Sequence, residues 1–334
     1  MKIQRLFSFV SIVTLLLMAC NVPGAAPAAP SPDTDPLRIG VSFYPGWWTF
    51  YLADAKGFFK QAGVDVELVR YDDEYIASTE AFAVKELDAV VETAGDAVIH
   101  AASGIPARAV LVTDYSAGAD GFISNKSLKS PADLRGRRLG VGVGTFGHLF
   151  ALTVLEDNGL TEADVTFVNV DAEDVPAALA DGKIDAGHAW EPYLSQALAG
   201  DARLVFSSAD TPGLIADVLV FQARVVQERP EDVRRVLRGW QMALDFWQSN
   251  PAEANEILAE ITGTPKDEID QARAGVNYFT LSDNVKVFTP SSSLTSIHTS
   301  AQANIDFYLA HGTITTAPDP KEFLVGSFVN ELVP

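Results

Sequence analysis

Short apolar runs and longer amphipathic segments alternate along the first third of the chain. The runs at 37–42, 64–71, 87–91 and 107–113 have the length and composition of β-strands. The segments between them, at 49–61, 77–86 and 96–103, show the spacing of helices. Strands that alternate with helices predict an α/β fold built on a largely parallel sheet.

The same order of elements returns between residues 130 and 193. A predicted strand at 138–143 is followed by a glycine-containing turn at 144–148, a helix at 149–158 and a second strand at 165–170. Asp185 in Lys-Ile-Asp-Ala then matches Asp88 in Glu-Leu-Asp-Ala, and we expect both to be structural turn residues. We therefore predict an internal duplication of a βαβαβ unit, with a cleft between turns at the strand ends.

The last third of the chain is mostly helical, after a short predicted strand at 219–223 that returns to the first unit. Another helix is expected at 291–309. One stripe of apolar residues recurs at helical spacing and is expected to be core: Val233, Val236, Leu237, Trp240, Leu244 and Trp247.

Charge and cysteine content exclude several classes of site. The chain has 334 residues and a net charge of -20, from 44 acidic and 24 basic residues, which argues against nucleic-acid binding. The single cysteine excludes an intrachain disulfide and a cysteine-based metal site. The histidines show no metal-ligand spacing, so we expect no metal site.

The N-terminus predicts an anchored protein. Lys2 and Arg5 precede an apolar run at 6–18, and residues 17–20 read Leu-Met-Ala-Cys, which resembles the bacterial lipoprotein signal. We expect residues 1–20 to be the signal, Cys20 to be lipidated, and residues 21–36 to be a flexible tether. The expected location is the cell membrane, lipid-anchored on its extracytoplasmic face. The alternative is an ordinary secretory signal with an incidental cysteine.

Three motifs give the chain a family resemblance. They are Trp-Thr-Phe-Tyr-Leu-Ala-Asp-Ala-Lys-Gly-Phe-Phe at 48–59, Asp-Leu-Arg-Gly-Arg-Arg-Leu-Gly-Val at 133–141, and Asp-Ala-Gly-His-Ala-Trp-Glu-Pro-Tyr at 185–193. With the signal, the chain resembles the substrate-binding lipoproteins of ABC importers for nitrate, sulfonates, taurine, thiamine pyrimidines and riboflavin.

The resemblance implies a type II periplasmic binding protein fold, with two Rossmann-like lobes joined by two crossover segments. Lobe one is expected at 37–123 plus 215–334, with a helical C-terminal part, and lobe two at 124–214. The implied partners are a small-molecule ligand and the permease and ATPase subunits. We expect a monomer that touches the membrane only through its anchor and uses no cofactor.

The predicted turns suggest the ligand chemistry. The turns at 42–51, 92–96, 114–121, 142–150 and 187–193 contain no lysine or arginine but several aromatic and acidic side chains. Aromatic walls suit a flat ring, and carboxylates suit N–H, hydroxyl or cationic groups. The expected ligand-binding residues are Tyr44, Trp47, Trp48, Tyr51, Glu92, Thr93, Asp114, Tyr115, Thr145, His148, Trp190, Glu191 and Tyr193.

A neutral or cationic heterocycle is thus favoured over a small oxyanion, with riboflavin as the best candidate. A thiamine-type pyrimidine is next, and a quaternary amine in an aromatic box is chemically sensible. The alternative is a sulfonate, taurine or nitrate anion held by helix N-termini and neutral donors such as Thr145.

Structural roles compete with ligand contact at several of these positions. Trp47 and Trp48 are adjacent and cannot both face one way, and we favour Trp47 for the cleft and Trp48 for the core. Trp190 is as compatible with the core as with the site, and Glu191 with a helix cap. His148 is somewhat better explained as a satisfied or solvated histidine. Asp114 and Tyr115 lie where a hinge role competes.

An enzyme on the same fold is the second function class considered. Pyrimidine synthases that resemble these receptors use a pocket lysine and a cysteine-rich segment. Here no lysine lies in the predicted turns, and the only cysteine is in the expected signal. No Ser-His-Asp or paired-acid arrangement is apparent, so no catalytic residues are expected. A sensory receptor is a third option.

Overall fold

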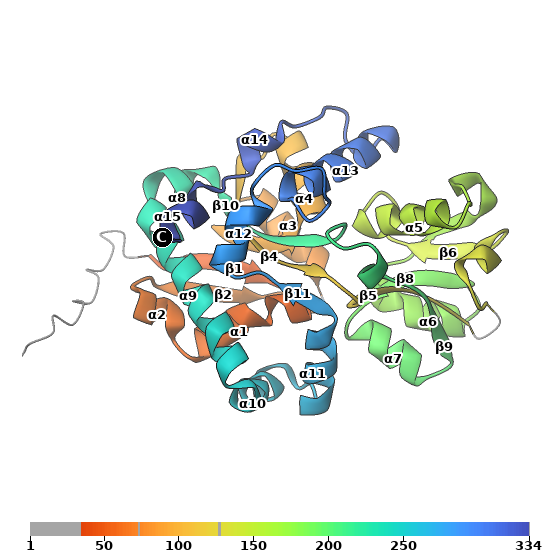
Figure 1. Cartoon of the computed structure of the whole chain (residues 1–334), viewed down its shortest axis with the longest axis horizontal. Helices are drawn as coiled ribbons and strands as arrows, with labels where there is room; N and C mark the ends of the chain where they lie inside the picture. The colour runs from red at the N-terminus through yellow and green to blue at the C-terminus, as the bar shows by residue number, and fades with distance from the viewer. Residues whose placement is uncertain (1–34, 73, 126–127, 334) are drawn as a thin grey trace, which may run out of the picture.

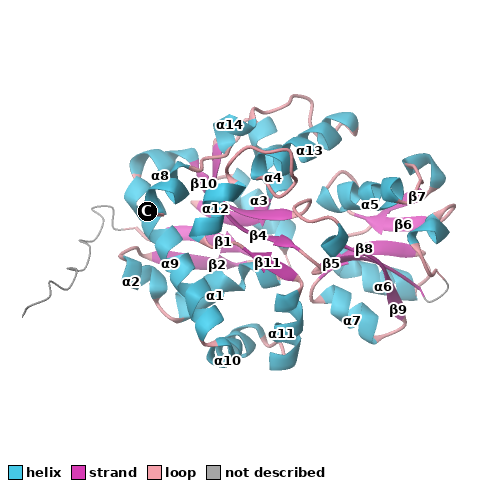
Figure 2. Ribbon diagram, viewed as in Figure 1, coloured by secondary structure: helices cyan, strands magenta, loops and turns pink. Residues whose placement is uncertain are grey.

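Two β-sheets, each flanked by helices, make up the computed structural model, which describes residues 35–72, 74–125 and 128–333 (Figures 1 and 2). Cys20 and the expected signal lie outside the described residues, as does the tether up to residue 34. The α/β class expected from the sequence is confirmed.

The first sheet has six strands in the order β11-β4-β10-β3-β1-β2. Strand β1 pairs in parallel with β2 and β3, whereas β10 runs antiparallel between β3 and β4, and β11 is antiparallel to β4. The strands are β1 (Leu37–Val41), β2 (Val66–Arg70), β3 (Ala89–Thr93), β4 (Ala107–Ser116), β10 (Ala216–Gln222) and β11 (Val276–Tyr278).

The second sheet has five strands in the order β7-β6-β8-β5-β9. Strand β6 is parallel to β7 and β8, and β5 is antiparallel to β8 and β9. The strands are β5 (Asp120–Asn125), β6 (Arg138–Val141), β7 (Thr166–Asn169), β8 (Ala186–Trp190) and β9 (Ala202–Ser207).

The two sheets repeat one arrangement, as the sequence duplication predicts. Each has a parallel trio, β2-β1-β3 or β7-β6-β8, followed by an antiparallel strand, β10 or β5. The backbone N–H of Arg38 donates to Asp88 over 3.0 Å, and that of Arg138 donates to Asp185 over 2.9 Å. Both aspartates therefore hold the start of the central strand, which confirms their structural role.

Helices cover the faces of both sheets (Figure 2). The α-helices are α1 (Trp48–Ala55), α2 (Phe58–Ala62), α3 (Tyr75–Ala83), α4 (Ala94–Ala102), α5 (Phe146–Asp157), α6 (Val175–Ala180), α7 (Tyr193–Ala199), α8 (Ala223–Glu228), α9 (Pro230–Ser249), α10 (Pro251–Thr262), α11 (Lys266–Ala274), α12 (Leu281–Val287), α13 (Ile297–Ala310), α14 (Pro320–Phe323) and α15 (Ser327–Leu332). Short 3₁₀ turns are η1 (Pro45–Trp47), η2 (Pro131–Leu134), η3 (Glu162–Asp164), η4 (Ala172–Asp174) and η5 (Ser208–Asp210).

Several expected elements have different bounds. The helix expected at 291–309 is α13, which begins only at Ile297, and the helix expected at 149–158 is α5, which begins at Phe146. The single helix expected at 49–61 is two helices, because Gly57 takes a left-handed conformation with φ of 66° between α1 and α2. The strand expected at 219–223 is β10, which begins at Ala216 and contains a buried Asp217 that breaks the apolar pattern. The apolar stripe on α9 is buried throughout, as expected.

The chain passes between the sheets at residues 117–119 and again at 208–215, in the region where Figure 1 shows the two halves meeting. The boundary expected after residue 123 falls inside β5, which belongs to the second sheet. We propose that the lobes divide at these two passages. Within the described residues, no helix is both long and apolar enough to span a bilayer.

Candidate functional site

A cavity of about 480 Å³, partly open to solvent, lies where the strand ends of the two sheets face each other. The first sheet contributes the turn after β1, the segment after β2 and the end of β3, and the second sheet contributes the ends of β5 and β8. The lining residues are Ser42, Phe43, Tyr44, Trp47, Asp72, Tyr75, Thr93, Asp120, Phe146, Glu173, Trp190, Tyr193, Ile215 and Asp217.

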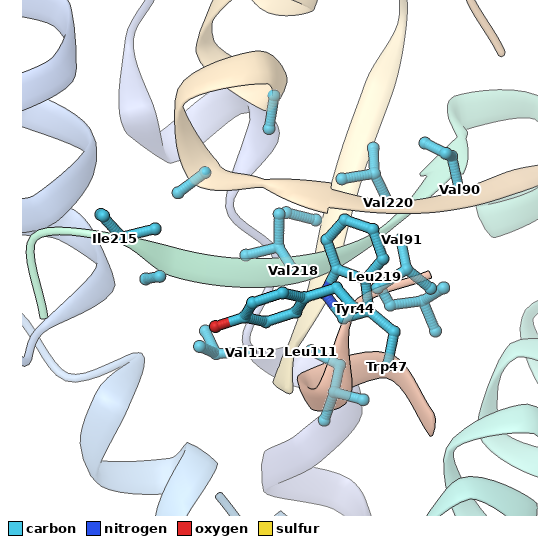
Figure 3. Close-up of a cluster of buried hydrophobic side chains, with 14 of the residues drawn as sticks. Tyr44, Trp47, Val90, Val91, Leu111, Val112, Ile215, Val218, Leu219 and Val220 are labelled. Atoms are coloured by element: carbon cyan, nitrogen blue, oxygen red, sulfur yellow. The ribbon is translucent and has the colours of Figure 1, made fainter. Parts of the chain in front are cut away.

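Aromatic rings form a continuous wall around this cavity. Trp47 contacts Tyr44 and Tyr75, with ring centroids 5.3 and 5.5 Å apart. Figure 3 shows the Tyr44 and Trp47 side chains beside β10, near Val218. Such rings favour a flat aromatic ligand through offset or edge-to-face contacts.

The second sheet completes this wall with Trp190. Its ring stacks on Phe146 at 5.8 Å, with an angle of 28° between the ring planes, and meets the edge of Tyr75 at 6.3 Å. Trp190 is only partly buried, so it presents a face to the cavity rather than filling a core. Aromatic surfaces from both sheets therefore face the same space.

The charge of the lining is entirely negative. Asp72, Asp120, Glu173 and Asp217 line the cavity, and no lysine, arginine or histidine is among its lining residues. Arg70 pairs with Asp72 over 2.8 Å. His188 lies 2.7 Å from Asp120. The electrostatic environment therefore opposes an anion and favours hydrogen-bond donors or a cation.

Five of the expected ligand-binding residues line the cavity: Tyr44, Trp47, Thr93, Trp190 and Tyr193. Thr145 lines an adjoining hollow of about 450 Å³, which shares the Tyr75, Phe146 and Trp190 side chains with the main cavity. The hydroxyl of Thr145 donates to the Gly142 carbonyl over 2.7 Å. This hydrogen bond stabilises the turn that precedes α5, so the Thr145 hydroxyl has a structural role.

Trp48 and Tyr51 do not reach the cavity. Trp48 is 1% exposed and packs against Phe43 and Trp247, because neighbouring residues of a helix point in different directions. The Tyr51 hydroxyl donates to Asp72 over 3.0 Å, so Tyr51 orients a lining carboxylate from behind. We therefore remove both from the proposed set of contacts.

Glu92 points away from the cavity because successive residues of a strand face opposite sides of the sheet. It precedes Thr93 on β3 and lies 3.0 Å from the His100 ring in a fully buried pair. Burial raises the pKa of Glu92, while His100 opposes the rise. Glu92 is therefore part of the core beneath α4.

Asp114 and Tyr115 lie one layer away from the lining. Asp114 is fully buried opposite Asp217 on the neighbouring strand, with its carboxylate against Gly46. Tyr115 packs on Phe279, with ring centroids 5.4 Å apart, on the side of β11. Neither residue lines the cavity, but the charge of Asp114 acts on Asp217, which does.

His148 and Glu191 have structural partners. The His148 ring packs against Phe167 at 4.3 Å and Phe307 at 5.3 Å, between α5 and α13. Glu191 accepts hydrogen bonds from the backbone N–H and hydroxyl of Ser195 over 3.1 and 2.7 Å, which caps the first turn of α7. The helix cap weighed for Glu191 fits this geometry. The satisfied or solvated histidine weighed for His148 does not, because the ring is buried and, among the described residues, its Nε2 has no hydrogen-bond partner. Neither side chain lines the cavity.

Several lining residues were missed in the sequence. Asp72 and Tyr75 follow β2, a strand end that carried no motif. Asp120 stood in the turn at 114–121 but had no partner visible in the sequence. Asp217 lay just before the strand expected at 219–223. The usable signal at Asp217 was an acid directly beside an apolar strand.

The described residues contain no cluster of three or more histidine, cysteine, aspartate or glutamate side chains arranged to hold a metal ion.

Comparisons with known proteins agree with this architecture. The chain is 28% identical over 272 residues to the riboflavin-binding protein RibY of Chloroflexus aurantiacus, a match that covers 76% of this chain and 77% of the relative. The periplasmic aliphatic sulphonate binding protein SsuA from Escherichia coli superposes with a TM-score of 0.73 at 19% identity, covering 87% of this chain and 92% of that structure.

The desulfurization enzyme DSZB superposes with a TM-score of 0.66 at 18% identity, covering 89% of this chain and 98% of that structure. These likenesses confirm the periplasmic binding protein fold. The family model described as NMT1/THI5 like matches residues 45–254, which is more than half of the sequence. The chain therefore belongs to the NMT1/THI5-like family.

Proposed function

We propose that this protein is an extracytoplasmic solute-binding receptor that delivers a small aromatic heterocycle to the permease and ATPase of an ABC importer. The family, the fold and the printed names of RibY and SsuA support the receptor role. Lipidation at Cys20, with anchoring to the outer face of the membrane, is part of this proposal and rests on the signal-like residues 17–20.

One observation carries the choice of ligand: the cavity combines seven aromatic side chains with four carboxylates and has no basic side chain in its lining. Riboflavin is the candidate with the widest ring system to stack. A thiamine-type aminopyrimidine is the second candidate.

A sulfonate or nitrate fits this lining less well. Such an anion needs cationic side chains or free donors at a helix N-terminus. The two threonines nearest to this role are already engaged, since Thr145 accepts from the Gly147 N–H over 3.2 Å and Thr93 from the Asp96 N–H over 3.2 Å. The buried Asp217 would repel an anion.

The lining also favours binding over catalysis. It contains no lysine to carry a covalent cofactor, no cysteine and no histidine to serve as base. DSZB uses the same fold as an enzyme, so the fold alone does not decide between the two classes. A receptor that signals through a membrane partner would use the same cavity, and a neighbouring permease gene would favour transport.

A ligand panel tests the proposal. Purified protein is titrated with riboflavin, thiamine, taurine and nitrate, followed by riboflavin fluorescence and by the thermal unfolding midpoint. We expect saturable binding of at least one heterocycle and no shift with taurine or nitrate. A thermal shift with taurine or nitrate, without a response to either heterocycle, would overturn the choice of ligand class.

A further inference from the structure

Three buried carboxylates meet at one end of the cavity, where the chain crosses between the sheets. Asp114 on β4 and Asp217 on β10 are direct antiparallel neighbours, and Asp120 begins β5. Their side chains are at most 2% exposed. Asp120 and Asp217 face the cavity, and Asp114 lies behind them.

Among the residues that the structure describes, none supplies a positive charge to Asp114 or Asp217. His188 lies 2.7 Å from Asp120 and is the partner of that carboxylate. By contrast, neither oxygen of Asp114 has a hydrogen-bond partner of normal geometry among the described residues, and its polar neighbours are the side chains of Thr113 and Asp217. The groups that most influence Asp217 are burial and the charges of Asp114 and Asp120, and none is a cation. Burial of an unpaired carboxylate costs several kcal/mol.

Burial and the neighbouring acids raise the pKa of Asp217 well above its ordinary value. The pKa of Asp114 rises to about 7 for the same main reason, burial. The Asp114–Asp217 pair therefore retains a proton at neutral pH and does not carry two full negative charges. A positively charged group entering the cavity would replace this proton and remove the cost.

Two buried polar atoms lie beside the pair. Among the described residues, the hydroxyl of Tyr44 and the indole N–H of Trp47 make no hydrogen bond of normal geometry. Their nearest polar neighbours are Ser116 for Tyr44 and Asp217 for Trp47. The Tyr44 and Trp47 side chains line the cavity and are at least nine-tenths buried. Their ring centroids are 5.3 Å apart in an edge-to-face contact. A ring face at this end of the cavity suits a cation through cation–π attraction.

We propose that Asp217, backed by Asp114 and flanked by Asp120, is a subsite for a positively charged nitrogen of the ligand. Trp47 and Tyr44 form the aromatic side of this subsite. The inference rests on the proposed receptor function and narrows its ligand class. The ligand is a cationic heterocycle, with its charged nitrogen at Asp217 and its flat ring between Trp47 and Trp190.

Thiamine and thiochrome make a suitable pair of probes, because thiamine carries a permanent positive charge and its oxidation product thiochrome is uncharged. Both are titrated calorimetrically into the full-length protein. We expect thiamine to bind more tightly than thiochrome by about tenfold or more. Equal binding, or tighter binding of thiochrome, overturns the subsite without the need for any variant.

Asp217→Asn removes the charge and keeps the shape of the side chain. It should abolish the preference for thiamine over thiochrome, measured as the ratio of their two affinities. The matched control is Asp181→Asn, which removes the same charge from an exposed carboxylate paired with Lys183 over 3.0 Å, and should retain the preference. A preference that survives Asp217→Asn overturns the proposal.

The same titrations distinguish failure of the charged subsite from failure of the proposed receptor function. If thiochrome or riboflavin binds and thiamine does not, the charged subsite is wrong and the heterocycle receptor stands. If no heterocycle binds and taurine does, both are wrong.

Discussion

Tyr75 on α3 and Trp190 at the end of β8 meet edge to face across the cavity, with ring centroids 6.3 Å apart. The Tyr75 hydroxyl donates to Asp96, so this ring is held from the first sheet. Trp190 rests on Phe146 on the other side. The contact brings one aromatic group from each sheet over the same ligand space, as expected for a receptor that closes over its ligand.

Trp190→Ala should weaken ligand binding by about tenfold, because it removes one stacking face together with its buried area. The urea midpoint should change little, since Trp190 is partly exposed. Calorimetric titration with the ligand identified by the panel measures the affinity. The matched control is Phe206→Ala, which removes a partly buried ring of the same sheet that packs on Phe150 instead. Equal loss of affinity in both variants would contradict the assigned role of Trp190.

The adjacent tryptophans provide a second prediction. Trp47→Ala should weaken binding by about tenfold or more through the lost aromatic wall, since Trp47 lines the cavity. Trp48→Ala should instead lower the free energy of unfolding by about 3–5 kcal/mol, the usual cost of removing a large buried side chain. Urea denaturation and ligand titration of both variants separate the roles. A larger loss of affinity in a stably folded Trp48→Ala protein would reverse the assignment.

Much of the fold could be predicted because it follows from local patterns. The apolar runs at 37–42 and 138–143 and the matched Asp88 and Asp185 specify strands and turns within single segments. The break at Gly57 was missed because helical spacing continues across it. Its left-handed backbone is a property that only the folded chain reveals.

The site was predictable only in part, for a related reason. Neighbouring residues of a helix or strand point in different directions, and the sequence does not show which of them faces the cavity. This direction separates Trp47, which lines the cavity, from Trp48, and Thr93 from Glu92. Asp217 is visible in the sequence as an acid beside an apolar run, but its pairing with Asp114 is not. The two meet only because β10 pairs with β4, and all five strands of the second sheet lie between these strands in the sequence.

Glu92→Gln is the third prediction and tests whether Glu92 is structural. The variant leaves the buried His100 with a weaker partner, so the free energy of unfolding should fall by about 1–3 kcal/mol. Ligand affinity should remain within about twofold, because the side chain faces away from the cavity. Urea denaturation gives the first quantity and calorimetry the second. A tenfold loss of affinity at unchanged stability would restore Glu92 to the binding site.

The last prediction concerns pH. The groups that face the Asp114–Asp217 pair are Asp120 from β5, Tyr44 from the turn after β1, and Tyr278 from β11. His188 pairs with Asp120 at the cavity, and Arg273 acts on Tyr278 from α11. None of these groups places a positive charge against the pair itself. The pH dependence of the Asp114–Asp217 pair should therefore be set mainly by the proton that the pair holds.

The pKa of Asp114 rises from its ordinary value of 3.8 to about 7 in the folded protein. Between these values the folded state holds a proton that the unfolded chain has released. The free energy of unfolding should therefore decrease as pH rises from about 4 to about 7, because the folded state must give up this proton. Asp217→Asn removes one of the two carboxyl groups. The free energy of unfolding of the variant should therefore increase relative to that of the native protein as pH rises over the same range.

Urea denaturation of both proteins at intervals between about pH 4 and pH 8 measures this difference. Affinity for thiamine should change in the opposite direction, rising with pH as the pair gives up the proton that the cation replaces. Asp181→Asn serves as the control and should follow the native pH dependence in both measurements. Parallel stability curves for the native protein and Asp217→Asn would show that the pair holds no shared proton, and the charged subsite would lose its electrostatic basis.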